Sequence, residues 1–592
     1  PCGAMALPAS PRPAREPLVA APACQDAGGS REAFLKAELR TMWMIGWPMA
    51  VSFFCRFAMM SMDAAFVGHL QDGGDGANAT GPPGSGLLMT RLVPALQAGD
   101  VLMGEGYGAK EYLAGATLSD MVTSIVTIPL LAMAFGISPL VGQAMGAGGS
   151  KMAGTWVQLC IFCITVAAVP FHIAFFFVSE LLRPLGFQPE LCELAGRYAK
   201  FSVFWVIPNM WYVALRFYFQ ALGLARPAMY VGLLFLGVNA LMNYCLVFGG
   251  PFERWLGWPG FGFIGAALSI SISRILQCLL YFIYMFRWRR AHLPTWPGWN
   301  TDFLRAEHMR AFLAQTLPQV GTLLLQMMIN QSVTLLVARL GSLAVASSSA
   351  ATSATIPFTI TFLATLSALA GIRVGFHLGG GRPDLARRTA WAIIGVGAAM
   401  MLAFALVMVP LRVELMTVIT SNEEVRDLAA QILPAVMLNL LAASIVQCGT
   451  GGILASQGRT RLSTLLSLCV ELPLSLGSIA ALVLIFHADV RIVYWTQAAA
   501  SVIEALIVLL IVWRSDWERY AAAAQARQRR GRPRGAEAAG AEQAESEAPE
   551  AGRGEQGDAG RPSAAASDAA ALKKPTAAGA RQVEPECRAG GA

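Results

Sequence analysis

The segment "WPMAVSFFCRFAMMSMDAAFVGHL", residues 47–70, is apolar over most of its length, yet it contains Arg56 and Asp63. A helix of this length crosses a hydrocarbon core of about 30 Å, so the segment is predicted to span a membrane. An ionised side chain at that depth costs roughly 2.5–3.5 kcal/mol on insertion scales. Both charged residues are therefore functional candidates.

The composition indicates a membrane protein. Of the 592 residues, 55% are hydrophobic and only 14% are charged, whereas soluble domains average about 25% charged residues. The net charge of +7 comes from Lys and Arg in short loops between apolar segments, where they act as topology signals. We therefore expect no nucleic-acid partner. The 11 cysteines are scattered and predict neither a disulfide framework nor a metal site.

Apolar runs long enough to cross a bilayer occur in two sets of six. They predict an all-α polytopic membrane protein with twelve transmembrane helices in two pseudo-symmetric six-helix bundles. The first set covers approximately 41–70, 112–146, 155–178, 191–222, 227–248 and 261–286, and the second covers 311–340, 343–378, 387–411, 427–456, 462–486 and 490–513.

An internal repeat supports the duplication. The segment "VGQAMGAGGSKMAGT" from Val141 aligns with "VGFHLGGGRPDLARRT" from Val374, so that four small residues coincide: Gly142, Gly146, Gly148 and Ala153 with Gly375, Gly379, Gly381 and Ala386. The Walker spacing of a phosphate-binding loop is absent from both segments. We expect the glycines to mark tight turns at the ends of spans.

These patterns predict the domain organisation. Residues 1–40 are expected to be a disordered or targeting segment, 41–290 an N-lobe with an inserted loop at about 71–110, 291–310 a linker, 311–515 a C-lobe, and 516–592 a disordered tail. Lys and Arg are concentrated in the loops after even-numbered spans, which predicts that the linker and both termini are cytosolic. The plasma membrane, the vacuole and the plastid envelope all remain open as locations.

Taken together, the motifs resemble the multidrug and toxic compound extrusion (MATE) family. The resemblance is carried by "WPMAVSFF", "MDAAFVGHL", "SPLVGQAMGAG", "FYFQALGLARPAM", "LLFLGVNALMNYCLVFG", "GFGFIGAALSISIS" and "AGIRVGFHLGGGRPDLARR", over roughly residues 40–515. It implies export of organic solutes by alternating access, driven by a proton or sodium gradient.

The resemblance also implies a coupling-cation site in the N-lobe. Asp63 takes the place of the family's first-span Asp, with Asn239 and Asn243 on one face of the fifth span. Ser269 and Ser271 are candidate additional oxygens. The alternative for the Asn pair is that it joins helices by hydrogen bonds.

The chain departs from the family pattern in the C-lobe. Gln326 stands where members often carry a Glu, eight residues after Pro318, and Ser444 stands where some carry a second acid. We therefore expect the C-lobe to lack its carboxylate pair, which places the chain nearer the bacterial and plastid-type branch than the animal type. Glu471 and Glu504 lie inside spans without a His partner. The predicted substrate cavity comprises Arg56, Met59, Gln326 and Gln331.

Three interpretations of Arg56 remain open. It precedes Asp63 by seven residues, two turns along the same helix face, so it could form an ion pair with that carboxylate. It could instead attract an organic anion, or extend toward the membrane interface.

The predicted function is a secondary active transporter that exports drugs, xenobiotics or secondary metabolites by proton or sodium antiport. The alternatives are an efflux carrier for citrate-like or phenolic-acid-like anions and a flippase for a lipid-linked substrate. The sequence lacks the clustered His, Asp and Glu of a membrane enzyme. We expect no cofactor besides the coupling H⁺ or Na⁺, and a monomer that interacts with a small organic substrate and the bilayer.

Overall fold

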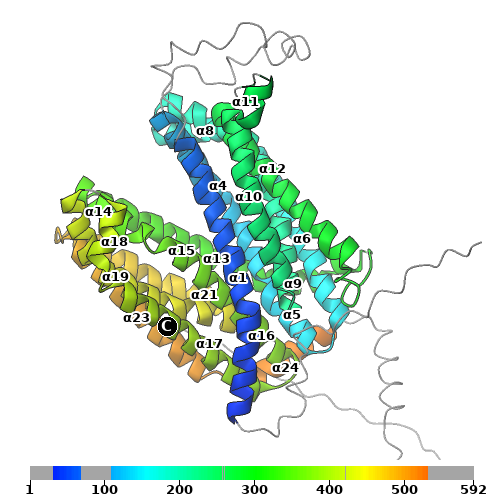
Figure 1. Cartoon of the computed structure of the whole chain (residues 1–592). Helices are drawn as coiled ribbons and strands as arrows, with labels where there is room; N and C mark the ends of the chain where they lie inside the picture. The colour runs from blue at the N-terminus through cyan, green and yellow to red at the C-terminus, as the bar shows by residue number, and fades with distance from the viewer. Residues whose placement is uncertain are drawn as a thin grey trace, which may run out of the picture. The chain divides into compact units, whose positions relative to one another are not determined.

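A computed structural model describes residues 31–68, 109–256, 258, 260–299, 301–420 and 422–530 (Figure 1). Helices are the only regular structure in these ranges, and eleven of them are long and apolar enough to cross a membrane. The predicted all-α polytopic fold is confirmed. The predicted insertion at about 71–110 lies outside the described residues, except for its last two, which begin α4.

The N-lobe consists of helices from the first half of the chain. Their bounds are α1 Arg31–Gly68, α4 Ala109–Phe135, α5 Ile137–Gly146, α6 Ser150–Phe175, α7 Val178–Leu182, η4 Arg183–Leu185, α8 Pro189–Ser202, η5 Val203–Trp205, α9 Val206–Ala221, α10 Arg226–Phe248, α11 Gly250–Leu256, α12 Gly262–Phe282 and η6 Ile283–Trp288. The short helix η7, Asp302–Leu304, lies in the predicted linker.

The C-lobe repeats this organisation and is followed by one further helix. The bounds are α13 Ala306–Ala338, α14 Ser342–Ser353, α15 Ile356–Phe358, η8 Thr359–Leu363, α16 Ala364–Gly379, α17 Pro383–Met408, α18 Arg412–Ile419, α19 Glu423–Gln447, η9 Cys448–Leu454, α20 Ala455–Gln457, α21 Thr460–Leu466, η10 Ser467–Gly477, α22 Ser478–Leu484, α23 Val490–Trp513 and α24 Trp517–Arg530.

One predicted span is a broken helix. Residues 191–222 form α8, the 3₁₀ turn η5 and α9 rather than one continuous helix. Pro208 lies in the first turn of α9, and a proline there has no backbone N–H to continue the hydrogen-bond ladder from α8. The break explains why eleven described helices, and not twelve, are long enough to span a membrane as single elements.

The two lobes contact each other closely where α5 crosses α16 (Figure 1). A Cβ atom placed on Gly142 would lie 2.6 Å from the carbonyl oxygen of Ile372, and one on Gly375 would lie 2.9 Å from that of Pro139. Cβ atoms on Gly146 and Gly379 would overlap the backbone of the opposite helix as well. The repeated glycines therefore let two backbones meet, a role beyond the tight turns expected from the sequence.

A buried ion pair joins the lobes near this crossing. Arg373 of α16 donates from Nε to Glu38 Oε1 at 2.8 Å and from Nη2 to Oε2 at 2.6 Å. Both side chains are almost fully buried, and His377 Nε2 lies 3.6 Å from Glu38 Oε1. Glu38 belongs to α1, so this bidentate pair connects the N-lobe to the C-lobe. Residues 31–40 are helical, and the prediction that the whole of 1–40 is disordered or targeting sequence was wrong for them.

The prediction of a disordered tail was also wrong in its first part, because residues 517–530 form the amphipathic helix α24. Trp517, Ala521 and Ala524 are buried, and α24 packs against α5 as well as α16 and α17. The low-complexity, Ala-rich and Arg-rich composition concealed this apolar face, because a helical stripe needs only every third or fourth residue to be apolar.

We expect truncation after Asp516 to lower the midpoint of thermal unfolding by several degrees. Truncation after Arg530 keeps α24 and is expected to leave the midpoint unchanged. Removing α24 exposes the apolar surface that Trp517 and Ala524 cover. Thermal unfolding of both truncated proteins in detergent checks this, and equal midpoints would contradict it.

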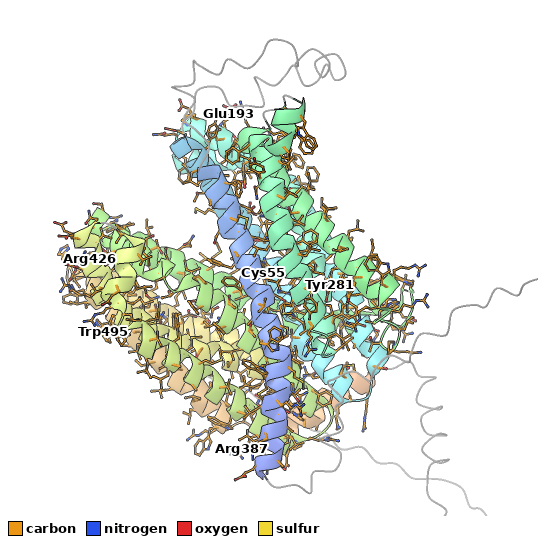
Figure 2. The ribbon with its side chains drawn as sticks, in the orientation of Figure 1. Cys55, Glu193, Tyr281, Arg387, Arg426 and Trp495 are labelled. Carbon is orange, nitrogen blue, oxygen red and sulfur yellow. The ribbon has the colours of Figure 1, made fainter. Side chains whose placement is uncertain are left out.

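The outer surface is apolar, as a lipid-facing surface requires. Trp495 on α23 is 49% exposed, whereas Cys55 on α1 and Tyr281 on α12 are fully buried (Figure 2).

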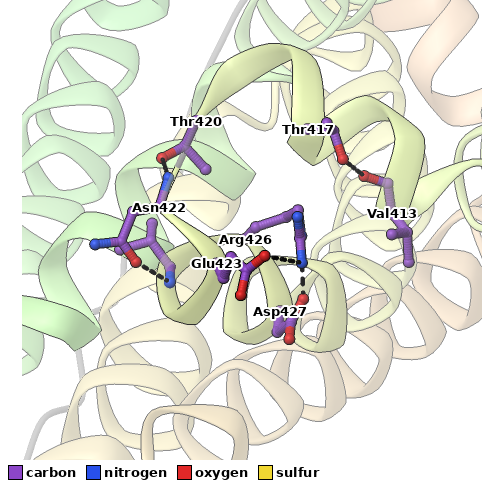
Figure 3. A network of polar contacts seen from close by, with 8 residues as sticks. Val413, Thr417, Thr420, Asn422, Glu423, Arg426 and Asp427 are labelled. Atoms are coloured by element: carbon purple, nitrogen blue, oxygen red, sulfur yellow. Dashed lines mark hydrogen bonds and ion pairs between the residues drawn. The ribbon is translucent and has the colours of Figure 1, made fainter.

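A group of polar residues lies at the end of a helix. At the start of α19, Asn422 accepts a hydrogen bond from the Val425 backbone N–H, and Arg426 pairs with Glu423 and Asp427 (Figure 3). Asn422 is thus an N-cap, which favours helix initiation here.

Candidate functional site

The centre of the N-lobe is a carboxylate held by two amides. Asn239 and Asn243, one turn apart on α10, each donate from Nδ2 to Asp63 Oδ1 at 2.7 Å. All three side chains are buried. The structure therefore brings together the three residues that the sequence analysis placed at the coupling site, whereas their binding of a cation stays a prediction.

The remaining atoms of this cluster are oxygens. Asp63 Oδ2, Asn239 Oδ1 and Asn243 Oδ1 are buried, and none of them has a hydrogen-bond partner among the described residues. A carboxylate can only accept, so the amide N–H groups must face Asp63 and their carbonyl oxygens remain available. Oxygen atoms of this kind are suitable ligands for a hard cation such as Na⁺. Alternatively, the carboxylate of Asp63 can bind a proton.

The two predicted serines differ in their surroundings. Both lie on α12, which packs against α10. The Ser269 hydroxyl is free in the described part of the chain, whereas Ser271 donates to the Phe201 carbonyl at 2.8 Å. Ser271 is therefore occupied in joining α12 to the end of α8, and Ser269 is the better candidate for an additional oxygen.

Arg274 is the cation that acts on Asp63, and the sequence analysis missed it. It is buried on α12 and attracts the Asp63 carboxylate electrostatically. Its Nη1 donates to Gln277 Oε1 at 3.2 Å and to the sulfur of Met59 at 3.5 Å. An Arg inside "SISRILQC" is itself a sign of function at membrane depth.

An ion pair between Arg56 and Asp63, one of the three interpretations of Arg56, is not among the ion pairs of the described residues. Arg56 is half-buried, and the charges acting on it are those of Arg216 and Arg274. Arg216 on α9 is 1% exposed, and its guanidinium carbon lies 4.3 Å from the centre of the Phe53 ring. Such a cation–π contact partly replaces water around the charge.

Several arginines gather in the N-lobe. Arg216 Nε and Nη2 are buried and have no hydrogen-bond partner within the described ranges. Asp120 of α4, which the sequence analysis did not single out, interacts electrostatically with Asp63. Arg56 of α1 interacts electrostatically with Arg216 of α9 and Arg274 of α12, so positive side chains from three helices come together in the N-lobe.

Met59 belongs to this polar centre. It is 2% exposed, with its sulfur against Arg274. The structure places Met59 in contact with Arg274, whereas its neighbour Met60 is exposed. That Met59 lines the substrate cavity stays a prediction.

The C-lobe contains a separate cavity of about 290 Å³, lined by residues of α13, η8, α19, η10 and α23. Gln326 lines it together with Asn330 one helical turn later, and the contact of Gln326 with substrate stays a prediction. Gln331 does not line this cavity and is exposed. The reason is helical periodicity, since residues four apart share a face and the next residue turns away from it.

The C-lobe holds a carboxylate pair at other positions than Gln326 and Ser444, where the sequence analysis expected the family's pair to be missing. Glu471 of η10 and Glu504 of α23 both line this cavity and act on each other electrostatically. Gln326 hydrogen-bonds to Glu471, whereas Ser444 lies outside the cavity and donates to the Leu441 carbonyl. The acids thus come from the eleventh and twelfth predicted spans and not from the seventh and tenth.

Comparison with known proteins identifies the family. The MatE family model matches residues 87–245 and 318–477, once in each half of the chain. An uncharacterized transporter of Schizosaccharomyces pombe is 27% identical over 403 residues, which cover 67% of this chain and 72% of the relative. Multidrug and toxin extrusion protein 1 of Xenopus tropicalis is 24% identical over 418 residues, or 69% of each chain.

The fold agrees with a solved structure of the same kind. The crystal structure of the eukaryotic MATE transporter AtDTX14 superimposes with a TM-score of 0.68 at 18% identity, covering 84% of this chain and all of that one. The predicted fold of two six-helix bundles is thereby confirmed. Because the family model matches more than half of the sequence, the chain belongs to the MatE family of multidrug and toxic compound extrusion transporters.

Proposed function

We propose that the protein exports organic solutes and that a cation, either H⁺ or Na⁺, is exchanged for the substrate at Asp63. The observation that carries this proposal is the geometry of the N-lobe centre. Two amides hold Asp63 Oδ1, and Oδ2 remains with the free oxygens of Asn239 and Asn243. A buried carboxylate arranged in this way can gain or lose a cation at Oδ2 while the two amides continue to hold Oδ1.

The charge of Asp63 provides the switch. When the carboxylate is ionised it attracts Arg274, and when it binds a proton this attraction is lost, so the α1–α12 packing changes with the bound ion. Each pH unit across the membrane supplies roughly 1.4 kcal/mol per proton. Each 100 mV adds about 2.3 kcal/mol per elementary charge. These amounts are sufficient to shift an equilibrium between two conformations.

The contacts between the lobes supply the conformational element. Alternating access requires α5 and α16 to separate, together with the Glu38–Arg373 pair that bridges the lobes beside them. The clustering of Arg residues in the loops at this end supports a cytosolic location for it and for both termini. In that orientation, the described arrangement is closed toward the cytosol.

A second candidate function is the efflux of an organic anion. It is favoured by Arg56 and Arg216, neither of which forms an ion pair with a carboxylate among the described residues. Fixed positive charge in a low-dielectric centre attracts an aromatic carboxylate strongly. Transport assays must therefore include both a cationic and an anionic substrate.

We expect Asp63→Asn to abolish gradient-driven uptake in proteoliposomes while leaving exchange of substrate across the membrane intact. Asn has the volume of Asp but cannot ionise. Uptake of a fluorescent organic cation and of an aromatic carboxylate is measured in parallel under an imposed proton or sodium gradient. Continued concentration of either substrate by the variant would contradict the proposal. The matched control is Asp302→Asn, a change in the exposed linker.

A further inference from the structure

A groove on the N-lobe lies apart from the residues around Asp63. It has a volume of about 760 Å³, and its described lining comes from α6, α9, α12, η6 and the linker. Its side chains open outward, since Leu279 is 52% exposed and Ile275 is 39% exposed. Both residues belong to a helix that is apolar enough to cross the membrane. The mouth of the groove is therefore expected to face the hydrocarbon of the bilayer.

The end of the groove beside the linker is polar. Gln158 is 8% exposed and donates from Nε2 to the Gly298 carbonyl of the linker at 2.8 Å. Its Oε1, an acceptor, and the indole Nε1 of Trp296, a donor, are buried without a partner among the described residues. Buried polar groups in proteins are usually hydrogen-bonded, so this end of the groove suits the polar part of a ligand.

Farther from the linker the groove is apolar. Thr165 lies two turns beyond Gln158 on α6, and its hydroxyl already accepts a hydrogen bond from Trp211 Nε1 at 2.9 Å. The lining extends from Ile275 on α12 to Phe286 on η6, a length of about 16 Å of helix. A groove that is long, apolar and polar only at one end matches an amphiphile whose head lies beside the linker.

The charge at the polar end is positive. The segment 283–310 contains five Arg and two acids, and one of these acids, Asp302, pairs with Arg305. Three of the arginines directly follow the groove, are exposed and form no ion pair among the described residues: Arg287, Arg289 and Arg290. Basic clusters beside a span attract anionic lipid head groups by about 1 kcal/mol per residue.

We propose that this groove binds an anionic phospholipid from the leaflet on the linker's side of the membrane. One acyl chain lies along the apolar lining, and the phosphate lies at Arg287 and Arg290. The Trp296 N–H donates to an ester or phosphate oxygen, and Gln158 Oε1 accepts from a hydroxyl of the head group. A free phosphate ion would leave the apolar part empty, and the ammonium group of a zwitterionic lipid would be repelled by the arginines.

The test is lipid binding to the full-length protein in detergent, measured by native mass spectrometry. Phosphatidylglycerol and phosphatidylcholine with identical acyl chains are compared. The wild type is expected to bind phosphatidylglycerol about tenfold more tightly, because two arginines contact its phosphate without an opposing ammonium group. The double variant Arg287→Gln with Arg290→Gln should lose this preference.

The matched control removes two equally exposed arginines at the start of α17, by Arg387→Gln with Arg388→Gln, and should keep the preference. All four arginines are exposed, so neither double variant disturbs the core. Equal binding of the two lipids by the wild type overturns the proposal. A preference that persists in the groove variant, or that is lost equally in the control, overturns it too.

A second measurement locates the acyl chain. Phosphatidylglycerol with brominated acyl chains quenches tryptophan fluorescence on contact. Trp211 lines the groove and is 38% exposed, whereas Trp495 on α23 is 49% exposed and lies in the C-lobe. At a low ratio of lipid to protein, Trp211→Phe is expected to remove more of the quenching than Trp495→Phe, and an equal or smaller loss overturns the proposal. A failure of coupling at Asp63 would change neither measurement.

Discussion

Replacing Glu38 with Gln is expected to destabilise the protein by roughly 3–5 kcal/mol, because it leaves a buried guanidinium without its counter-charge. Arg373 makes two short hydrogen bonds to this carboxylate, at 2.8 Å and 2.6 Å. Its Nη1 is already buried without a partner among the described residues. Gln accepts through one oxygen only, so the bidentate geometry is lost together with the charge.

The measurement is thermal unfolding in detergent, with Glu32→Gln as the matched control. Glu32 lies on the same helix but is exposed, so its loss should leave the midpoint unchanged. The double variant Glu38→Leu with Arg373→Met removes both charges and should recover most of the lost stability, as buried pairs replaced by apolar residues often do. If Glu38→Gln unfolds at the wild-type temperature, the pair does not hold the lobes together.

Gly146→Ala is expected to reduce the rate of transport by about tenfold or more. This corresponds to destabilising the closed arrangement of the two lobes by at least roughly 1.4 kcal/mol. The added methyl group would overlap the carbonyl of Phe376 on α16. Backbone cannot move aside as the tip of a flexible side chain can, so α5 and α16 must separate. Because the crossing is pseudo-symmetric, Gly379→Ala should have the same effect through Gln143.

The control for this prediction is Gly237→Ala on α10. A Cβ atom there meets nothing within 4 Å, and alanine favours the helix over glycine by about 1 kcal/mol. Substrate uptake rates of the three variants in proteoliposomes, normalised to reconstituted protein, provide the test. Full activity of Gly146→Ala would mean that the close crossing is not a working state of the transporter.

Much of the architecture could be predicted because a bilayer imposes simple rules. Apolar runs and the repeat of "VGQAMGAGG" in "VGFHLGGGR" were sufficient for the spans and the two lobes. The pairing of Asn239 with Asn243 followed from their four-residue spacing, which places both on one helix face. That they meet Asp63 depended on the family resemblance, since α1 and α10 are far apart in the sequence.

The parts that could not be predicted depend on tertiary contacts. Glu471 and Glu504 are 33 residues apart in the sequence, and only the packing of η10 against α23 brings both to one cavity. Arg274 was available as a signal in the sequence, whereas its approach to Asp63 required α12 to pack against α1. Glu38 lay outside the predicted spans and so escaped notice, although a buried carboxylate would have been a candidate at once.

The central claim is that substrate movement is coupled to an ion at Asp63. The most direct test loads proteoliposomes with substrate, imposes no ion gradient, and records proton and sodium movement as the substrate runs downhill. We predict that one of the two ions moves in the opposite direction in the wild type and that this movement is absent in Asp63→Asn. Downhill movement of substrate by the wild type with neither ion moving, or unchanged ion movement in Asp63→Asn, would contradict the account.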